Sequence, residues 1–218
     1  MKGLAQLVSI VAFWFVRREW LELRACLALA YQSHMNDDAG YPSILAQQLL
    51  ISGEDHRFFS HGGIDLVAVC RALWRGIVLR HPEGASTIEM QIVRVLSGRY
   101  ERTTRRKVRE MALATLVTRE IPKGALPAIY LRLGYFGWRM NGFAAACRHL
   151  GLCIESLTSI DTALLVARLK YPQPRDVSPH RWRQIDTRAQ HLLHLHLHHQ
   201  HEHAYLGLPE RSAYAATF

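Results

Sequence analysis

The sequence predicts a mostly α-helical protein, and three observations support this fold class. Apolar residues recur at intervals of three and four in several segments, which is the spacing of one helix face. No segment alternates apolar and polar residues long enough to predict a strand, and no internal repeat is present. The 218 residues are 49% hydrophobic, which suffices for one packed domain and argues against a disordered chain.

The first segment is an uncharged, mostly apolar run over residues 3–16. As a helix it would reach about 21 Å, short of the roughly 30 Å of a bilayer's hydrocarbon core. Arg17 and Arg18 follow it, and the aromatic residues 13–15 suit a membrane interface. Because no clean cleavage site follows, residues 1–40 are expected to form a retained membrane anchor and linker. A buried core helix is the alternative.

Four further segments show the helical period and are joined by short turns. They are residues 44–51, 66–77, 108–116 and 161–170. We therefore expect one helical domain over residues 41–182, between the N-terminal anchor and a C-terminal tail over residues 183–218.

The net charge of +9 is concentrated inside the expected domain. Residues 101–182 contain 14 basic and 6 acidic side chains, residues 1–100 contain 10 and 9, and residues 183–218 contain 3 and 3. A basic segment within a folded domain predicts a cationic wall around a bound anion. Aromatic residues that could stack on bases do not interleave with it, so nucleic acid is not an expected partner.

The four cysteines are widely spaced in apolar surroundings and form no CxxC pair, which argues against a zinc knuckle. We expect buried thiols, and a disulfide between Cys147 and Cys153 remains open.

Carboxylates gather in residues 51–65 beside aromatic residues and glycines. Glu54 and Asp55 lie at the end of a predicted helix, and Phe58 and His61 follow. A carboxylate beside apolar bulk is a candidate general base. The alternative is that Asp55 and Asp65 cap helices and bind backbone amides. The catalytic and the capping roles are compatible, with Glu54 as the reacting group and Asp55 as the residue that holds the loop.

The segment 84–91 places Ser86 and Thr87 just before an apolar helix. Hydroxyl caps and free backbone amides at a helix start form an anion site. A cap without a ligand is the alternative.

In residues 101–110, Arg106 and Lys107 precede Glu110 by four and three positions. On a helix, these three charged groups meet on one face, and the cations remain able to bind a second anion. A solvated surface of salt bridges is the alternative.

Taken in order, these segments resemble the family 51 glycosyltransferases, which polymerise peptidoglycan as single enzymes or as the first domain of bifunctional penicillin-binding proteins. Five ordered motifs over about residues 42–182 carry the resemblance. The first motif is matched by Glu54, Asp55, Phe58, His61, Gly63 and Asp65, and the second by Gly84, Ser86, Thr87, Ile88 and Gln91. The third is matched by Arg102, Thr103, Arg106, Lys107 and Glu110, and the fourth by Lys123, Tyr130, Leu131, Tyr135, Phe136 and Gly137. The fifth is matched by the apolar helix from Ala163 to Pro172.

Four positions depart from the family pattern. Met90 stands where a Gln is usual, Ala128 where a Glu is usual, Arg132 where an Asn is usual, and Asp161 where a Glu is usual. The first three changes bear on sugar binding or on the packing that supports it.

The resemblance implies a lysozyme-like helical domain with a small membrane-associated jaw subdomain. It implies an inverting enzyme that polymerises lipid II into β-1,4-linked glycan strands and releases undecaprenyl diphosphate. By analogy, the catalytic residues are Glu54, as the base, and Glu110, which orients the cations or the diphosphate and its metal. The expected substrate-binding residues are Asp55, Phe58, His61, Ser86, Thr87, Gln91, Arg94, Arg102, Arg106, Lys107, Lys123 and Tyr130.

Mg²⁺ or another divalent cation is expected with the substrate diphosphate, and we assign no metal ligands of the protein itself. The expected partners are lipid II, the growing glycan strand, the membrane and other cell-wall synthesis proteins. The implied location is the bacterial cytoplasmic (inner) membrane, with the catalytic domain on the outer, periplasmic face. No penicillin-binding motifs are present, so transpeptidation is not expected.

Two other functions compete with this one. A divergent, weakly active or inactive paralogue would bind lipid II or glycan strands as a scaffold. A lysozyme-like hydrolase would use paired carboxylates to cut glycan. The cation-rich third motif argues against hydrolysis, because that reaction has no diphosphate to hold.

Residues 191–203 contain seven of the 13 histidines. On a helix, His194, His198 and His201 would share a face and could bind Zn²⁺ or Ni²⁺. The alternative is a partly helical, pH-sensitive surface extension without a metal.

Overall fold

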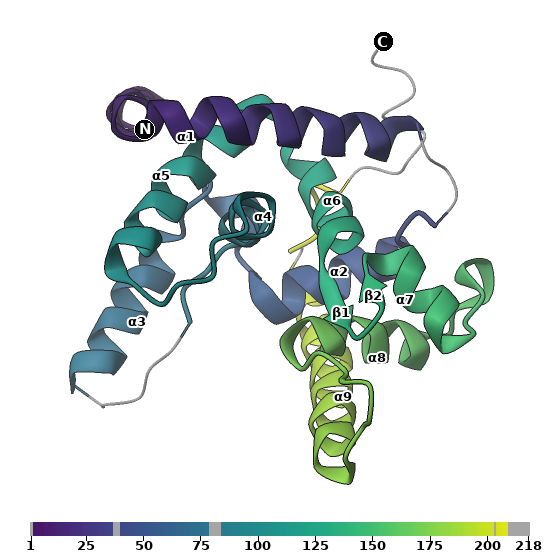
Figure 1. The fold of residues 1–218 in the computed structure, drawn as a ribbon. Helices are drawn as coiled ribbons and strands as arrows, with labels where there is room; N and C mark the ends of the chain where they lie inside the picture. The colour runs from purple at the N-terminus through teal and green to yellow at the C-terminus, as the bar shows by residue number, and fades with distance from the viewer. Residues whose placement is uncertain (1, 37–39, 79–83, 203, 209–218) are drawn as a thin grey trace. The chain divides into compact units, whose positions relative to one another are not determined.

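The computed structural model describes residues 2–36, 40–78, 84–202 and 204–208. Within these ranges the chain forms nine α-helices, three short 3-10 helices and one two-stranded hairpin (Figure 1). The predicted mostly α-helical class is therefore confirmed. Contacts divide the chain into two compact units, which we describe separately: unit 1 contains residues 1–29 and 57–123, and unit 2 contains residues 30–56 and 124–218.

Unit 1 has its core where two helices, α4 and α5, pack together. Fully or nearly buried apolar side chains fill this contact: Ile88, Met90, Ile92 and Val93 from α4, and Leu113, Ala114, Leu116 and Val117 from α5. The bounds of its elements are α1 Lys2–Asn36, η1 Phe58–Ser60, α3 Leu66–Val78, α4 Ile88–Ser97, α5 Thr104–Glu120 and η2 Lys123–Ala125. Both α1 and η2 continue into unit 2.

Helix α1 is 35 residues long and has non-helical backbone angles at one position, Val16. From there, Val16, Trp20, Leu23 and Leu27 are buried at spacings of four, three and four, the stripe of a helix that packs on a core. The helix therefore continues through most of the stretch that was expected to be a linker.

Among the residues that the structure describes, no helix combines the length and the apolar character that a bilayer crossing requires.

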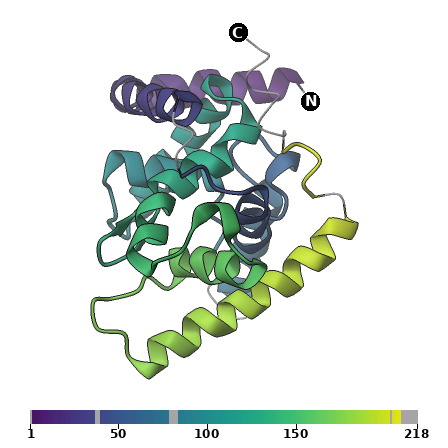
Figure 2. The same ribbon diagram turned by 90° about the vertical axis from the view of Figure 1, so that its right-hand side faces the viewer.

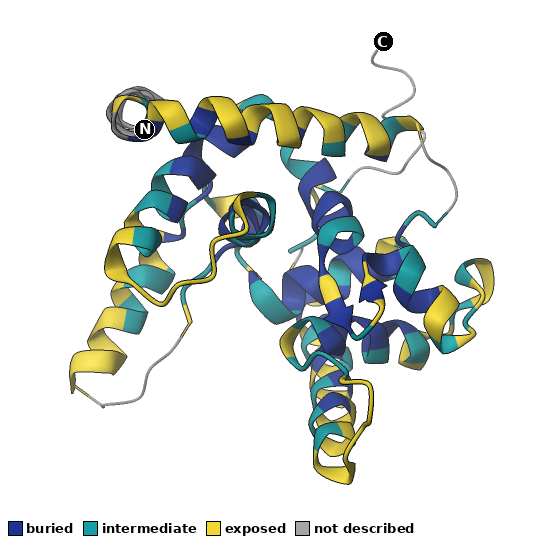
Figure 3. Cartoon of the chain, viewed as in Figure 1, coloured by how far each residue is buried: buried dark blue, intermediate teal, exposed yellow. Residues whose placement is uncertain are grey.

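Unit 2 is organised around helix α2, which contacts α6, α8 and α9. Leu49, Leu50 and Ile51 of α2 are completely buried, and Figure 3 shows the buried positions of this unit concentrated on α2, α6 and α8. Helix α9 lies along α8 (Figure 2). The bounds are α2 Ile44–Glu54, α6 Leu126–Leu133, β1 Tyr135–Gly137, β2 Met140–Asn141, α7 Phe143–Leu150, η3 Ile154–Ser156, α8 Ser159–Lys170 and α9 Pro179–His201.

Hydroxyl side chains set the starts of five helices by accepting a hydrogen bond from a backbone amide of the first turn. They are Ser43, Thr87, Thr103, Thr158 and Ser178. Thr158 forms a capping box in which Asp161 accepts from the backbone amide of Thr158. The aspartate that departs from the family pattern therefore has a structural role at the start of α8.

Strands β1 and β2 form a hairpin that the sequence did not predict. They pair antiparallel between Tyr135 and Asn141, and Gly137 also bridges to Gln173. Gly137 has φ of +142°, and a Cβ there would lie 2.2 Å from the carbonyl oxygen of Gln173, so this close approach requires glycine. Strands of two and three residues are too short to show a period of two.

All four cysteines are free thiols, so Cys147 and Cys153 form no disulfide. Cys147 is buried, and burial raises the pKa of its thiol to about 11. The expectation of buried thiols is wrong for the other three, which are exposed.

Helix α9 crosses the expected boundary between residues 182 and 183. Ile185, Ala189 and Leu192 are buried, and α9 contacts both α2 and α8. Residues 183–201 are thus packed into unit 2, while the remaining expected boundaries stay predictions.

Candidate active site

Glu54 is the last residue of α2, and Arg188 of α9 holds its side chain. The Nη2 atom of Arg188 donates to Oε1 of Glu54 at 3.1 Å and to the carbonyl oxygen of Gly53 at 2.6 Å. The side chain of Arg188 is only 9% exposed and that of Glu54 is 23% exposed. A partly buried guanidinium therefore fixes one oxygen of the proposed base, and the glutamate side chain as a whole remains partly exposed.

Asp55 and Tyr130 also belong to unit 2. Asp55 is the C-cap residue of α2, where its backbone amide donates to the carbonyl oxygen of Ile51, and its side chain is buried. Tyr130 is buried in α6. Asp55 therefore ends the helix that carries Glu54 through its backbone amide. The capping alternative holds for Asp65, whose Oδ1 accepts from the amides of Val67 and Ala68 at the start of α3.

Glu110 of α5 lies in unit 1 and is 3% exposed. Arg94 of α4 binds it through both oxygens, with Nε 2.9 Å from Oε1 and Nη2 3.1 Å from Oε2. Arg106, four residues before Glu110, donates from Nη1 to Oε1. A carboxylate with a bidentate arginine and a second guanidinium is a strongly bound ionic cluster, not a solvated surface.

Lys107 does not join Glu110 by a hydrogen bond but donates to Oγ of Ser86 at 2.7 Å. Arg94 reaches the same hydroxyl at 3.5 Å. Burial lowers the pKa of Lys107, the nearby Glu110 opposes this, and Arg94 and Arg106 lower it further. The structure therefore brings together five of the predicted site residues: Ser86, Arg94, Arg106, Lys107 and Glu110.

Thr87 is almost fully buried, and its hydroxyl group is used within the fold. It donates to the carbonyl oxygen of Gly63 at 2.8 Å and accepts from the amide of Met90 at 3.3 Å. Gly63 has φ of +98°, and a Cβ there would lie 2.4 Å from the carbonyl oxygen of Ala114 in α5. The hydroxyl group of Thr87 therefore joins the second motif to the first, and the close approach of position 63 to α5 requires glycine there.

Lys123 is the centre of a second group in unit 1. Its ammonium lies 2.9 Å from Oε1 of Glu89, donates to the carbonyl oxygen of His61, and sits 4.4 Å from the ring centre of Phe58. Glu89 is completely buried. The cation expected to bind substrate is thus paired with a carboxylate that the motif match did not include.

The two remaining predicted residues of unit 1 are Gln91, partly buried in α4, and Arg102, exposed before α5. Two of the departures from the family pattern, Met90 and Ala128, are completely buried apolar side chains. Arg132 donates to the carbonyl oxygen and to Oγ of Ser33 at the end of α1.

A cavity of about 510 Å³ in unit 1 includes Glu110 and Arg106 in its wall. Four arginines and four glutamates contribute to the wall, and Arg99 and Arg109 both pair with Glu19. Another part of the wall is apolar, with Leu23, Val93, Leu96 and Leu113. Such a wall suits a ligand that has both a polar and an apolar part.

The expected Mg²⁺ does not fit the Glu110 cluster as an ion bound by the protein. Both oxygens of this carboxylate already accept hydrogen bonds from guanidinium groups, and three cations surround it. Mg²⁺ needs several oxygen ligands and is repelled by such an environment.

Sequence reasoning missed Arg188 and Glu89. The signal for Arg188 is its position within the helical apolar stripe of Ile185, Ala189 and Leu192, where a cation needs a buried partner. Glu89 follows Ile88 at the start of an apolar helix, and nothing in that local pattern distinguishes it from a first-turn acidic residue.

The helical fold and these two sets of groups define a class of protein. The Glu110 cluster provides a surplus of positive charge beside a partly apolar cavity, and Glu54 provides a fixed carboxylate that can accept a proton. This is the chemistry of a helical protein that binds an anionic, partly apolar substrate.

Comparisons with known proteins identify the family. A family model described as Transglycosylase matches residues 31–196. Penicillin-binding protein 1A of Rickettsia felis is 31% identical over 158 residues, which are 70% of this chain and 20% of that protein. Penicillin-binding protein 1A of Escherichia coli is 34% identical over 124 residues, 56% of this chain and 15% of that protein. A candidate transglycosylase of Cupriavidus necator is 32% identical over 138 residues, 62% of this chain and 60% of that protein.

Because the family model covers more than half of its residues, the chain belongs to the transglycosylase family. The resemblance read from the motifs is therefore confirmed. The helical architecture is consistent with the lysozyme-like domain that the family implies. The chain spans a fifth or less of the length of the two penicillin-binding proteins.

Proposed function

We propose that this chain polymerises lipid II into β-1,4-linked glycan strands and releases undecaprenyl diphosphate. The observation that carries the proposal is the cluster around Glu110. Arg94, Arg106 and Lys107 supply three positive charges against one carboxylate, so two positive charges remain to bind an anion. A departing diphosphate is the anion that this family's reaction would place there.

Glu54 is proposed as the general base. It takes the proton from the 4-hydroxyl group of the incoming sugar while the hydroxyl oxygen attacks the anomeric carbon of the growing chain. The bond from that carbon to the diphosphate breaks, and the configuration inverts. The contact with Arg188 supports this role, because it holds Oε1 in one orientation while the glutamate stays accessible.

The cavity beside Glu110 supports a lipid-linked substrate. Arg105 and Arg106 of its wall suit the diphosphate, and the apolar part of the wall suits the first carbons of the polyprenyl chain. Mg²⁺ or another divalent cation would then enter only with the diphosphate.

The other expected substrate-binding residues keep that role as proposals. Thr87 and Lys123 already have partners within the fold, so we propose that they act by holding the first and second motifs in place. Asp55, Phe58, His61, Gln91, Arg102 and Tyr130 are proposed to line the path of the sugar.

We also propose that unit 1 contacts the outer face of the cytoplasmic membrane, as the jaw of the family would. Helix α3 supports this, because it exposes the large apolar side chains Leu66, Leu73, Trp74 and Ile77. A contiguous exposed apolar face of this kind marks a membrane or protein contact. Other cell-wall synthesis proteins are proposed as partners.

The competing scaffold function was motivated by Met90, Ala128 and Arg132. The first two are buried in the packed core and the third bonds to Ser33, so these departures lie in structural positions. Hydrolysis of glycan is disfavoured because the Glu110 cluster has an anion site for which that reaction has no use.

The test is to incubate the purified full chain with labelled lipid II, with and without MgCl₂, and to resolve the products by gel electrophoresis. The Glu54→Gln variant should form no polymer, because an amide cannot accept the proton. Asp186→Asn, an exposed carboxylate of α9 in the same unit, is the matched control and should polymerise normally.

Circular dichroism must show that both variants fold. Polymer formation by Glu54→Gln at the rate of the unsubstituted protein would reject Glu54 as the base. Tight lipid II binding without turnover by the unsubstituted protein would instead establish the scaffold function. Release of soluble fragments from isolated peptidoglycan would establish hydrolysis.

A further inference from the structure

The C-terminal end of α9 carries closely spaced histidines with different environments. His196 and His199 are buried, whereas His194, His198 and His201 are exposed. The expectation that His194, His198 and His201 form the metal-binding face is not what the structure shows. The convergent set is His198, His199 and Glu202.

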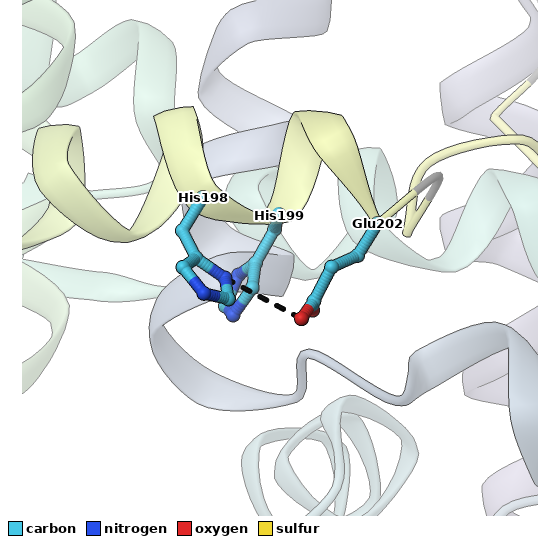
Figure 4. Close-up of side chains that lie close together, drawn as sticks. All are labelled: His198, His199 and Glu202. Carbon is cyan, nitrogen blue, oxygen red and sulfur yellow. Dashed lines mark ion pairs between the residues drawn. The ribbon is translucent and has the colours of Figure 1, made fainter.

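Each of these three side chains offers one ligand atom, and the three atoms lie within 4.8 Å of one another. Nδ1 of His198 is 3.5 Å from Oε1 of Glu202 (Figure 4). Helix geometry explains the convergence. Glu202 follows His198 by four positions and His199 by three, so it projects between them, and side chains on a helix lean toward its N-terminal end.

His199 provides a second, independent indication of a ligand. It is 7% exposed, and its Nδ1 atom is buried with no hydrogen-bond partner in the described part of the chain. Its ring stacks on that of His56, with centroids 5.4 Å apart. A buried imidazole nitrogen without a partner costs free energy, and coordination of that Nδ1 atom to a metal ion would offset the cost.

The donor set selects the kind of metal. Two imidazoles and one carboxylate are ligands that Zn²⁺ accepts, with water completing a tetrahedral shell. Mg²⁺ and Ca²⁺ prefer oxygen ligands throughout. Zn–N bonds of about 2 Å place the ligand atoms of a tetrahedral site roughly 3.3 Å apart. The three ligand atoms already lie within 4.8 Å of one another, so small rotations of the exposed side chains of His198 and Glu202 bring them to that spacing.

We propose that His198, His199 and Glu202 form a binding site for Zn²⁺ at the C-terminal end of α9. The ion joins the last turn of the helix to the segment that follows it and fixes the ring of His199. His56, which stacks on that ring, is two residues beyond Glu54 in the same unit. The site is structural, and its occupancy is independent of glycan polymerisation.

The experiment is calorimetric titration of the untagged full chain with ZnCl₂, with MgCl₂ as the comparison ion. We expect one Zn²⁺ per chain and no Mg²⁺ binding. His198→Ala and Glu202→Gln should each weaken Zn²⁺ binding at least tenfold, and since both positions are exposed these changes should leave the fold intact. His194→Ala, an exposed histidine of the same helix outside the cluster, is the matched control and should bind Zn²⁺ normally.

Substitution of Co²⁺ for Zn²⁺ provides a second measurement, because a tetrahedral site with nitrogen and oxygen ligands gives visible absorption bands. His199→Ala should abolish these bands, and circular dichroism shows whether that variant folds. If the unsubstituted chain binds no Zn²⁺, the site does not exist. If His194→Ala weakens binding as much as His198→Ala does, the histidines of α9 bind Zn²⁺ diffusely and the proposed site is rejected.

Discussion

Glu110 is the residue that holds Arg94 and Arg106 in place in unit 1. It accepts hydrogen bonds from Arg94 and Arg106 and is 3% exposed. Removal of one member of a buried ionic cluster is costly because the remaining charges lose their partner, by about 3–5 kcal/mol in typical cases. A change at Glu110 would therefore alter both the stability of the protein and the position of the arginines.

Lys107 allows a prediction about pH. Burial lowers the pKa of its ammonium, so it loses its proton at a lower pH than an ordinary lysine does. Since the charged form is the one that binds the diphosphate, polymerisation should decline on the alkaline side as Lys107 is deprotonated. In Lys107→Arg the guanidinium stays charged at higher pH than the lysine does, so this decline should move to higher pH, with a loss at neutral pH of about tenfold or less.

The measurement is the rate of polymer formation as a function of pH. Lys170→Arg, at an exposed lysine of α8, is the matched control and should leave the profile unchanged. If Lys107→Arg and the unsubstituted protein decline at the same pH, Lys107 is not the group that limits the alkaline rate.

Arg188 allows a prediction about orientation. Arg188→Met removes the donor that holds Oε1 of Glu54, so kcat should fall by roughly 10- to 100-fold while KM for lipid II changes little. Arg188→Lys should restore part of kcat, because an ammonium can still reach one acceptor.

The control is Arg183→Met, an exposed arginine on the same helix, which should retain kcat. Steady-state kinetics separates the two constants, and thermal melting shows whether the variants fold. A folded Arg188→Met protein with normal kcat would limit this arginine to a packing role.

At the scale of elements, α9 is the helix whose role differs most from the sequence expectation. Its apolar stripe packs on α2 and α8, and the contact with α2 is close: a Cβ added to Gly53 would lie 2.3 Å from Cδ2 of Leu192. Leu192→Ala should therefore destabilise the protein by about 2–4 kcal/mol through loss of burial and formation of a cavity.

Leu197→Ala provides the matched comparison. Leu197 is on the same helix but is 61% exposed, so its truncation should cost less than about 0.5 kcal/mol. Urea unfolding followed by circular dichroism measures both changes. Equal, small effects of the two substitutions would mean that α9 does not contribute to the folded unit.

The elements with a clear apolar period could be predicted from the sequence. The segments 44–51, 66–77, 108–116 and 161–170 all lie within observed helices. The hairpin after α6 could not, because its strands are too short for a pattern. Helix α9 was not recognised as part of the domain because its histidines interrupt its apolar stripe. The burial of that stripe against α2 and α8 is visible only in the structure.

At the scale of the whole molecule, the net charge of +9 is a property of the surface as well as of the site. The chain should bind vesicles that contain phosphatidylglycerol, and the bound fraction should fall several-fold between 0.1 and 1 M NaCl. The reason is that the screening length shortens from about 10 Å to 3 Å over that range. Sedimentation of the vesicles measures the bound fraction.

Phosphatidylcholine vesicles are the control and should bind less protein at low salt. If binding is the same for both lipids and does not respond to salt, the apolar face of α3 and not the charge governs membrane contact.

The sequence by itself determined the helical class, the order of the motifs, the family and the local pairing of Arg106 with Glu110. These features depend on spacing along one helix or on short motifs, which the chain carries without reference to its fold. Only the tertiary structure decided that Arg94 binds Glu110 across 16 positions, that Lys123 pairs with Glu89, and that Arg188 reaches Glu54 across 134. Such contacts are set by which helices pack together, and local periodicity has no information about that choice.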